Sequence, residues 1–145
     1  MEHELLVDFP VVVRLPVQWG DMDAYGHVNN TVFFRYFESA RVEYLDRCGF
    51  LRSFQRERVG AILHSTRCRF RRALTHPDTV LVGAAAREVE EDRFTHEYRL
   101  VSVSGDHVAA EGSGVVVSFD YDRGTKAPIP APVREGIASL EEGAG

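Results

Sequence analysis

The sequence is poor in cysteine, the residue that forms disulfides and holds structural zinc. It has two cysteines, Cys48 and Cys68, and neither has a second cysteine or a histidine at metal-ligand spacing. We therefore expect no metal site and no other cofactor, and we interpret both cysteines as buried free thiols.

Long apolar runs are missing as well. No stretch of the sequence approaches the roughly 20 apolar residues that a membrane-spanning helix needs. The first four residues are acidic rather than basic, which differs from the pattern of a secretion signal. These features predict a cytoplasmic protein without a membrane partner.

Lysine is almost absent, since Lys126 is the only one, and the formal net charge is -5. This charge argues against a general nucleic-acid surface. Arginine supplies the positive charge and gathers locally at Arg67, Arg69, Arg71 and Arg72. A guanidinium binds phosphate with two parallel hydrogen bonds, but arginine enrichment alone does not identify a ligand.

Several catalytic motifs are absent too. The chain has no G-x-S-x-G, no G-x-x-x-x-G-K-[ST], no H-E-x-x-H and no G-x-G-x-x-G. A nucleophilic-serine hydrolase, a P-loop enzyme, a zinc protease and a Rossmann reductase all lose support.

One stretch concentrates polar chemistry just before an apolar-periodic segment. Its carboxylates, glycine, imidazole and amides are Asp21, Asp23, Gly26, His27, Asn29 and Asn30. From Thr31 to Cys48, apolar residues recur every three or four positions and predict a helix, with Asn29 or Asn30 as N-cap and Gly49 as the stop. The polar groups would then lie at a helix N-terminus, which favours negative charge.

The remaining pattern predicts strands. Alternation of apolar and polar residues predicts them at 11–19, 61–73, 79–89, 93–103 and 108–119, joined by short reversals. Pro16 places the first strand at an edge or a bulge. Residues 50–58 predict a helical turn at most, and a short helix is expected near 133–141, before a frayed tail. Residues 1–145 therefore suit a single α+β domain with a mostly antiparallel sheet and one long helix.

The run G-D-M-D-A-Y-G-H-V-N-N-x-x-F-F-R-Y-F-E-x-A-R resembles the opening of the hotdog-fold acyl-CoA thioesterases of the 4-hydroxybenzoyl-CoA thioesterase family. The likeness is specific over about thirty residues and weaker over the later strands. It implies a five-stranded antiparallel sheet wrapped around one long central helix, dimers that join two sheets, and active sites at the dimer interface. The element count is compatible with this fold but does not select it.

The resemblance also implies catalytic roles. Asp23 matches the family's catalytic carboxylate, which attacks the thioester carbonyl or deprotonates a water that does so. Asn30 matches the residue whose backbone N–H stabilises the thioester oxygen. His27 could orient substrate, hold the turn that contains Asp23, or satisfy a local carbonyl. The side chain of Asn29 is either a cap or a ligand, and Asp21 is interpreted as structural.

Other positions are candidates for substrate binding. Arg69 and Arg71 either receive the phosphates of coenzyme A or lie on a solvated strand face, and Arg93 is a further candidate by its family position. His64 either lines the acyl pocket or is a satisfied interior histidine. Glu38 and Arg41 could form a structural pair on the helix, or Glu38 could approach the site.

Three functions fit these residues. The first is an acyl-CoA thioesterase that works as a homodimer or homotetramer without metal; the others are an enoyl-CoA hydratase or dehydratase on the same fold, and a non-catalytic acyl-CoA-binding module. The sequence does not identify the acyl group, and it does not distinguish coenzyme A from acyl carrier protein.

Overall fold

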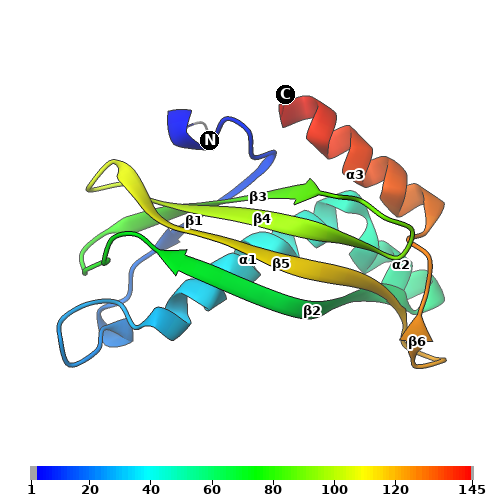
Figure 1. Cartoon of the computed structure of the whole chain (residues 1–145), viewed down its shortest axis with the longest axis horizontal. Helices are drawn as coiled ribbons and strands as arrows, with labels where there is room; N and C mark the ends of the chain where they lie inside the picture. Colours follow the sequence, from blue (N-terminus) through cyan, green and yellow to red (C-terminus); the bar gives the residue numbers. More distant parts are fainter. Residues whose placement is uncertain (1–2, 145) are drawn as a thin grey trace.

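An antiparallel sheet curls around one long helix in the computed structural model, which describes residues 3–144 (Figure 1). The elements in chain order are η1 (Glu4–Leu6), β1 (Val11–Pro16), η2 (Trp19–Asp21), α1 (Asn30–Cys48), α2 (Phe50–Glu57), β2 (Val59–Phe70), β3 (Thr79–Arg87), β4 (Arg93–Ser102), β5 (His107–Asp120), β6 (Thr125–Lys126) and α3 (Ala131–Ala144).

The sheet order is β1-β3-β4-β5-β2, with β6 paired to β5. All pairings are antiparallel. The five strands expected from alternation are β1 to β5, and β6 is a two-residue strand that the alternation did not predict. The α+β class and the wrapped helix are confirmed.

One connection differs from the expected short reversal. β3 follows β2 in the chain, yet β2 pairs with β5 while β3 pairs with β1 and β4. Residues 71–78 therefore cross from one side of the sheet to the other. Alternation within a strand does not encode its neighbour, so this crossover was invisible in the sequence.

α1 begins and ends where its sequence allows. The side chain of Asn29 accepts a hydrogen bond from the backbone N–H of Thr31, so Asn29 is the N-cap. Gly49 has a φ of 100°, a left-handed conformation that glycine adopts without strain, and it ends the helix.

The inner face of the sheet has room for this aromatic helix. A Cβ at Gly112 would lie 2.4 Å from a ring carbon of Phe37 and 2.7 Å from the carbonyl oxygen of Arg67. The Phe37 ring stacks on Tyr98 at a centroid distance of 4.9 Å. The absence of a side chain at Gly112 therefore leaves the space that the ring of Phe37 occupies.

Gly114 differs from Gly112, because its nearest neighbours are Leu63, the carbonyl of Ser65 and the hydroxyl of Tyr98 rather than the helix.

Two helices are longer than the sequence indicated. α2 is an eight-residue helix rather than a single turn, and it buries Phe50 beside Phe94. α3 is 14 residues long and reaches Ala144, so residues 142–144 are helical rather than frayed. Both helices owe their length to packing, which propensity alone does not reveal.

Candidate functional site

The turn between η2 and α1 is held together by Asp23. Its backbone N–H donates to the carbonyl of His27 at 2.7 Å, and its Oδ1 accepts from the backbone N–H groups of Tyr25 at 2.9 Å and His27 at 3.3 Å. Gly26 supplies a φ of 80°, which closes the turn. Asp23 is exposed, and its second oxygen accepts no hydrogen bond from residues 3–144. One carboxylate oxygen therefore holds the turn and the other faces solvent.

The same turn is tied to the start of α1. The backbone N–H of Asn29 donates to the carbonyl of Asp21 at 2.9 Å, and Met22 and Val28 form a bridge. Asn30 is the first residue of the helix, and its backbone N–H finds no acceptor within the described part of the chain. An exposed donor at the positive end of a helix dipole can stabilise an oxyanion.

The surroundings of Asp21 fit a structural role. It is half-buried and lies 3.4 Å from the guanidinium of Arg35. The buried hydroxyl of Tyr36 has no hydrogen-bond partner within residues 3–144, and burial, together with the negative charge of Asp21, raises the pKa of Tyr36 to about 12. The apolar stripe of the sequence contained Tyr36, but nothing in that pattern showed its hydroxyl beside Asp21.

The two histidine candidates lie apart. His27 is exposed in the turn, where its backbone, not its ring, makes the described hydrogen bonds. His64 is exposed on β2 at a shift in register between Leu63 and Ser65, so the interpretation of His64 as an interior histidine is wrong.

The arginine candidates are spread over β2 and β4. Arg69 and Arg71 line one surface hollow with Arg67 and Glu111, and Arg71 forms an ion pair with Glu111. Arg93 lies at the start of β4 and pairs with Asp92 at 2.9 Å. The structure thus brings Arg69 and Arg71 together and leaves Arg93 elsewhere.

A polar chain runs beneath α1, and the sequence did not predict it. Arg41 lies 3.8 Å from Glu38, as expected for an i,i+3 pair, and also donates to the hydroxyl of Tyr98 at 3.3 Å. That hydroxyl lies 3.1 Å from Nδ1 of the fully buried His96. Beside it, Arg35, Glu38 and Arg41 line a hollow between α1 and β2.

Exposed aromatic side chains flank the turn. Trp19 is 72% exposed and Tyr25 is 87% exposed. The turn projects beyond the body of the protein at the end of the sheet where β2 finishes (Figure 1).

Residues 3–144 contain no group of three or more histidine, cysteine, aspartate or glutamate side chains placed to hold a metal ion. No helix in that range is long and apolar enough to span a membrane. Burial raises the pKa of both the Cys48 and the Cys68 thiol to about 11. Cys48 is buried as expected, whereas Cys68 is only half-buried, so the expectation of a buried thiol is wrong for Cys68.

Comparison with known proteins identifies relatives along most of the chain. The family described as the Thioesterase-like superfamily matches residues 17–137. A protein of Aquifex aeolicus (strain VF5), whose name gives it as a candidate esterase, is 33% identical over 90 residues, which are 61% of this chain and 70% of that protein.

Solved structures agree with this match. A thioesterase from Thermus thermophilus, solved in complex with coenzyme A and Zn, is 31% identical with a TM-score of 0.81 over 93% of this chain and 96% of that one. A gentisyl-coenzyme A thioesterase is 24% identical with a TM-score of 0.76 over 87% and 98%, and this likeness shows the fold alone.

Proposed function

Because the chain belongs to the thioesterase-like superfamily, we propose that it hydrolyses an acyl-CoA thioester to the free acid and coenzyme A. The observation that carries this proposal is the turn in which a solvent-facing carboxylate oxygen of Asp23 is tied to the N-terminus of α1. The match to a thioesterase complexed with coenzyme A supports an acyl-CoA as the substrate.

In the proposed reaction the free oxygen of Asp23 attacks the thioester carbonyl or takes a proton from a water that attacks. The carbonyl oxygen becomes negatively charged and accepts the backbone N–H of Asn30, a donor that is already in place and can contribute roughly 3–4 kcal/mol. Collapse of this intermediate breaks the C–S bond, and the departing thiolate of coenzyme A takes up a proton. If Asp23 attacked, water then hydrolyses the acyl-aspartate; if it acted as base, the acid forms directly.

The other residues have supporting roles in this proposal. Arg69 and Arg71, which line one surface hollow, are proposed to receive the phosphates of coenzyme A, and His64 on the same strand is proposed to line the acyl pocket. His27 and Asn29 hold the turn through their backbone groups, and the Asn29 side chain also caps the helix. Arg93, paired with Asp92 at another site, stays a weaker candidate.

Replacement of the catalytic carboxylate tests the assignment. Asp23→Asn keeps an oxygen that can accept the turn hydrogen bonds but removes the base, so kcat on acyl-CoA substrates should fall about 10²–10⁴-fold. Thiol release from a panel of acyl-CoAs measures this rate, and thermal unfolding checks that the fold is retained.

Asp21→Asn is the matched control, because Asp21 lies two residues away and contacts Arg35 instead of facing solvent. It should keep kcat within a few-fold. Equal, slow thiol release from wild type and Asp23→Asn on every thioester would refute hydrolysis, and a change in enoyl-CoA absorbance would then favour a hydratase.

The proposed assembly is a homo-oligomer that joins two sheets at β2. β2 is a twelve-residue edge strand, and no described strand pairs with its outer side. Ile62, Leu63 and Phe70 are exposed on it. In an antiparallel pair centred near Ser65, the apolar half of one β2 lies against the arginine-rich half of the other, so like charges stay apart.

A further inference from the structure

The turn that carries the candidate carboxylate rests on a loop from a distant part of the chain. Met22 and Val28 pair across this turn and form its two arms. The backbone N–H of Val28 donates to the carbonyl of Leu74 at 2.8 Å. The sulfur of Met22 accepts the backbone N–H of His76 at 3.5 Å. Each arm therefore has one hydrogen bond to the crossover loop (residues 71–78).

The crossover loop is itself held at its start and in its middle. The backbone N–H groups of Arg71 and Arg72 donate to the carbonyl of Ala109 on β5 at 2.9 and 3.0 Å. The side chain of Leu74 is 1% exposed and belongs to the main core. The loop therefore packs as part of the core, although it contains no helix or strand of its own.

Asp78 holds the end of the crossover loop in place. Its Oδ1 accepts from the backbone N–H groups of Thr79 at 2.7 Å and Ser104 at 2.9 Å, and its Oδ2 accepts from the hydroxyl of Ser102. Its carbonyl accepts the backbone N–H of Val17 at 2.9 Å, in the segment that leads into the turn. One residue thus joins β3, the β4–β5 turn and the chain that follows β1.

We infer that the crossover loop sets the position of the catalytic carboxylate, and that Asp78 is a positioning residue for Asp23. The inference rests on the proposed thioesterase function, and Asp78 acts through the loop rather than on the substrate. Because Val28 directly precedes the cap of α1, the loop also sets the separation between Asp23 and the backbone N–H of Asn30. A displacement of about 1 Å in such a site can lower a rate about 100-fold.

Asp78→Ala removes the acceptor of three donors and tests the inference. We expect kcat for acyl-CoA hydrolysis to fall about 10–100-fold while KM stays within about threefold, because Asp78 does not line the hollow of the proposed phosphate-binding arginines. Asp78→Asn keeps Oδ1 as an acceptor, and its amide can donate to the hydroxyl of Ser102. This variant should therefore stay within about threefold of the wild-type kcat.

Glu141→Ala is the control for lost stability. Glu141 accepts hydrogen bonds from Tyr44 and Ala86 near the far end of β3, whereas Asp78 directly precedes the start of that strand. Glu141→Ala should also unfold more easily, but it should keep kcat within about twofold of wild type. A fall in kcat that is specific to Asp78→Ala therefore does not come from lost stability.

Hydrogen exchange at the backbone N–H of Val28 reports the contact with the loop without turnover. NMR should show this N–H exchanging about tenfold faster in Asp78→Ala than in Glu141→Ala, because a displaced loop opens the hydrogen bond to Leu74.

Met22→Leu tests the other arm of the turn and serves where Asp78→Ala does not fold. Leucine keeps the volume of the side chain and removes the acceptor of the His76 N–H. We expect kcat to fall about three- to tenfold at an unchanged KM and melting temperature.

The outcomes separate this inference from the proposed function. A wild type that hydrolyses no thioester would refute the thioesterase. An active wild type with equal kcat for Asp78→Ala and Glu141→Ala, or with wild-type kcat in Met22→Leu, would refute the positioning role alone. Equal losses in Asp78→Ala and Asp78→Asn would assign the effect to the carboxylate charge and would also overturn that role.

Discussion

His96 is fully buried between aromatic rings on the inner face of β4. Its ring meets Tyr44 at 4.7 Å and Phe94 at 4.9 Å, and Nε2 has no hydrogen-bond partner within residues 3–144. Burial, reinforced by the nearby charge of Arg41, lowers the pKa of His96 to about 3. The folded protein therefore holds this imidazole in its neutral form at pH 7.

This depressed pKa predicts a loss of stability in acid. Between about pH 6.5 and pH 3 the unfolded chain binds a proton at His96 and the folded chain does not, so the free energy of unfolding falls as the pH falls through this window. Denaturant unfolding at several pH values should show a shallower decline for His96→Phe than for wild type. Parallel declines would contradict the prediction, whatever the offset at pH 7.

Single residues show how much of the site and the core the sequence alone can predict. The motif identified Asp23, Gly26 and Asn30, because a turn and its polar residues can be recognised from a short stretch of sequence. The alternation in β4 placed His96 on one face with Phe94 and Tyr98, but it could not show that this face meets α1. His64 also lies in an alternating strand pattern, but it is exposed. Its strand lies at the edge of the sheet because of the crossover, and the sequence pattern did not show that crossover.

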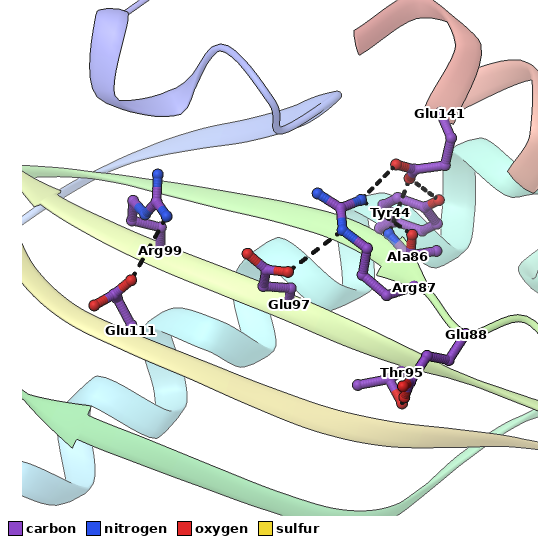
Figure 2. A network of polar contacts seen from close by, with 9 residues as sticks. All are labelled: Tyr44, Ala86, Arg87, Glu88, Thr95, Glu97, Arg99, Glu111 and Glu141. Atoms are coloured by element: carbon purple, nitrogen blue, oxygen red, sulfur yellow. Dashed lines mark hydrogen bonds and ion pairs between the residues drawn. The ribbon is translucent and has the colours of Figure 1, made fainter. Parts of the chain in front are cut away.

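At the scale of elements, one carboxylate of α3 contacts both the sheet and α1. Figure 2 shows Glu141 reaching from α3 toward Tyr44, Ala86 and Arg87. Its Oε2 accepts from the hydroxyl of Tyr44 at 2.6 Å and from the backbone N–H of Ala86 at 2.9 Å, and Oε1 lies 3.1 Å from Arg87. β1 pairs with β3 only as far as Ala84, so it offers no acceptor to the backbone N–H of Ala86. Glu141 supplies that acceptor.

Loss of this carboxylate should be costly. Glu141→Ala leaves a buried hydroxyl and a backbone N–H without their acceptor, so we expect the free energy of unfolding to fall by about 2–4 kcal/mol. Glu142→Ala, at the exposed neighbouring position, should change it by less than about 0.5 kcal/mol. Urea unfolding of both variants measures this difference, and similar midpoints would show that the Glu141 contact does not stabilise the fold.

This contact also explains why α3 was only partly predicted. Its prolines and small residues give a weak helical pattern, and its full length depends on apolar packing of Val133 and Ile137 and on the distant Glu141 contact. α1, by contrast, has its cap, its stripe and its stop within one continuous stretch, and it was predicted nearly to the residue.

For the whole molecule, the two edges of the sheet differ. β1 is a six-residue edge ending in Pro16, which has no N–H to donate, whereas β2 offers twelve residues without proline. This asymmetry favours association through β2 and leaves the β1 edge unpaired.

The mass in solution checks this assembly. Light scattering should give two or four times the 16.3 kDa of one chain. Ser65→Lys should shift the mass toward one chain, because two lysines would meet at the centre of the paired strands. Val103→Lys, at an exposed position in the β4–β5 turn, should keep the wild-type mass. A monomeric wild type would contradict any site shared between two copies.

The exposed indole of Trp19 has a practical consequence. It is the only tryptophan of the chain, and it stands in the short helix that leads into the Asp23 turn. Its emission therefore comes from one known place, and a change in the surroundings of that ring changes the fluorescence of the whole protein. Trp19 is thus an intrinsic fluorescent probe. The rate at which a second copy or coenzyme A binds near this ring could be measured from its fluorescence without any added label.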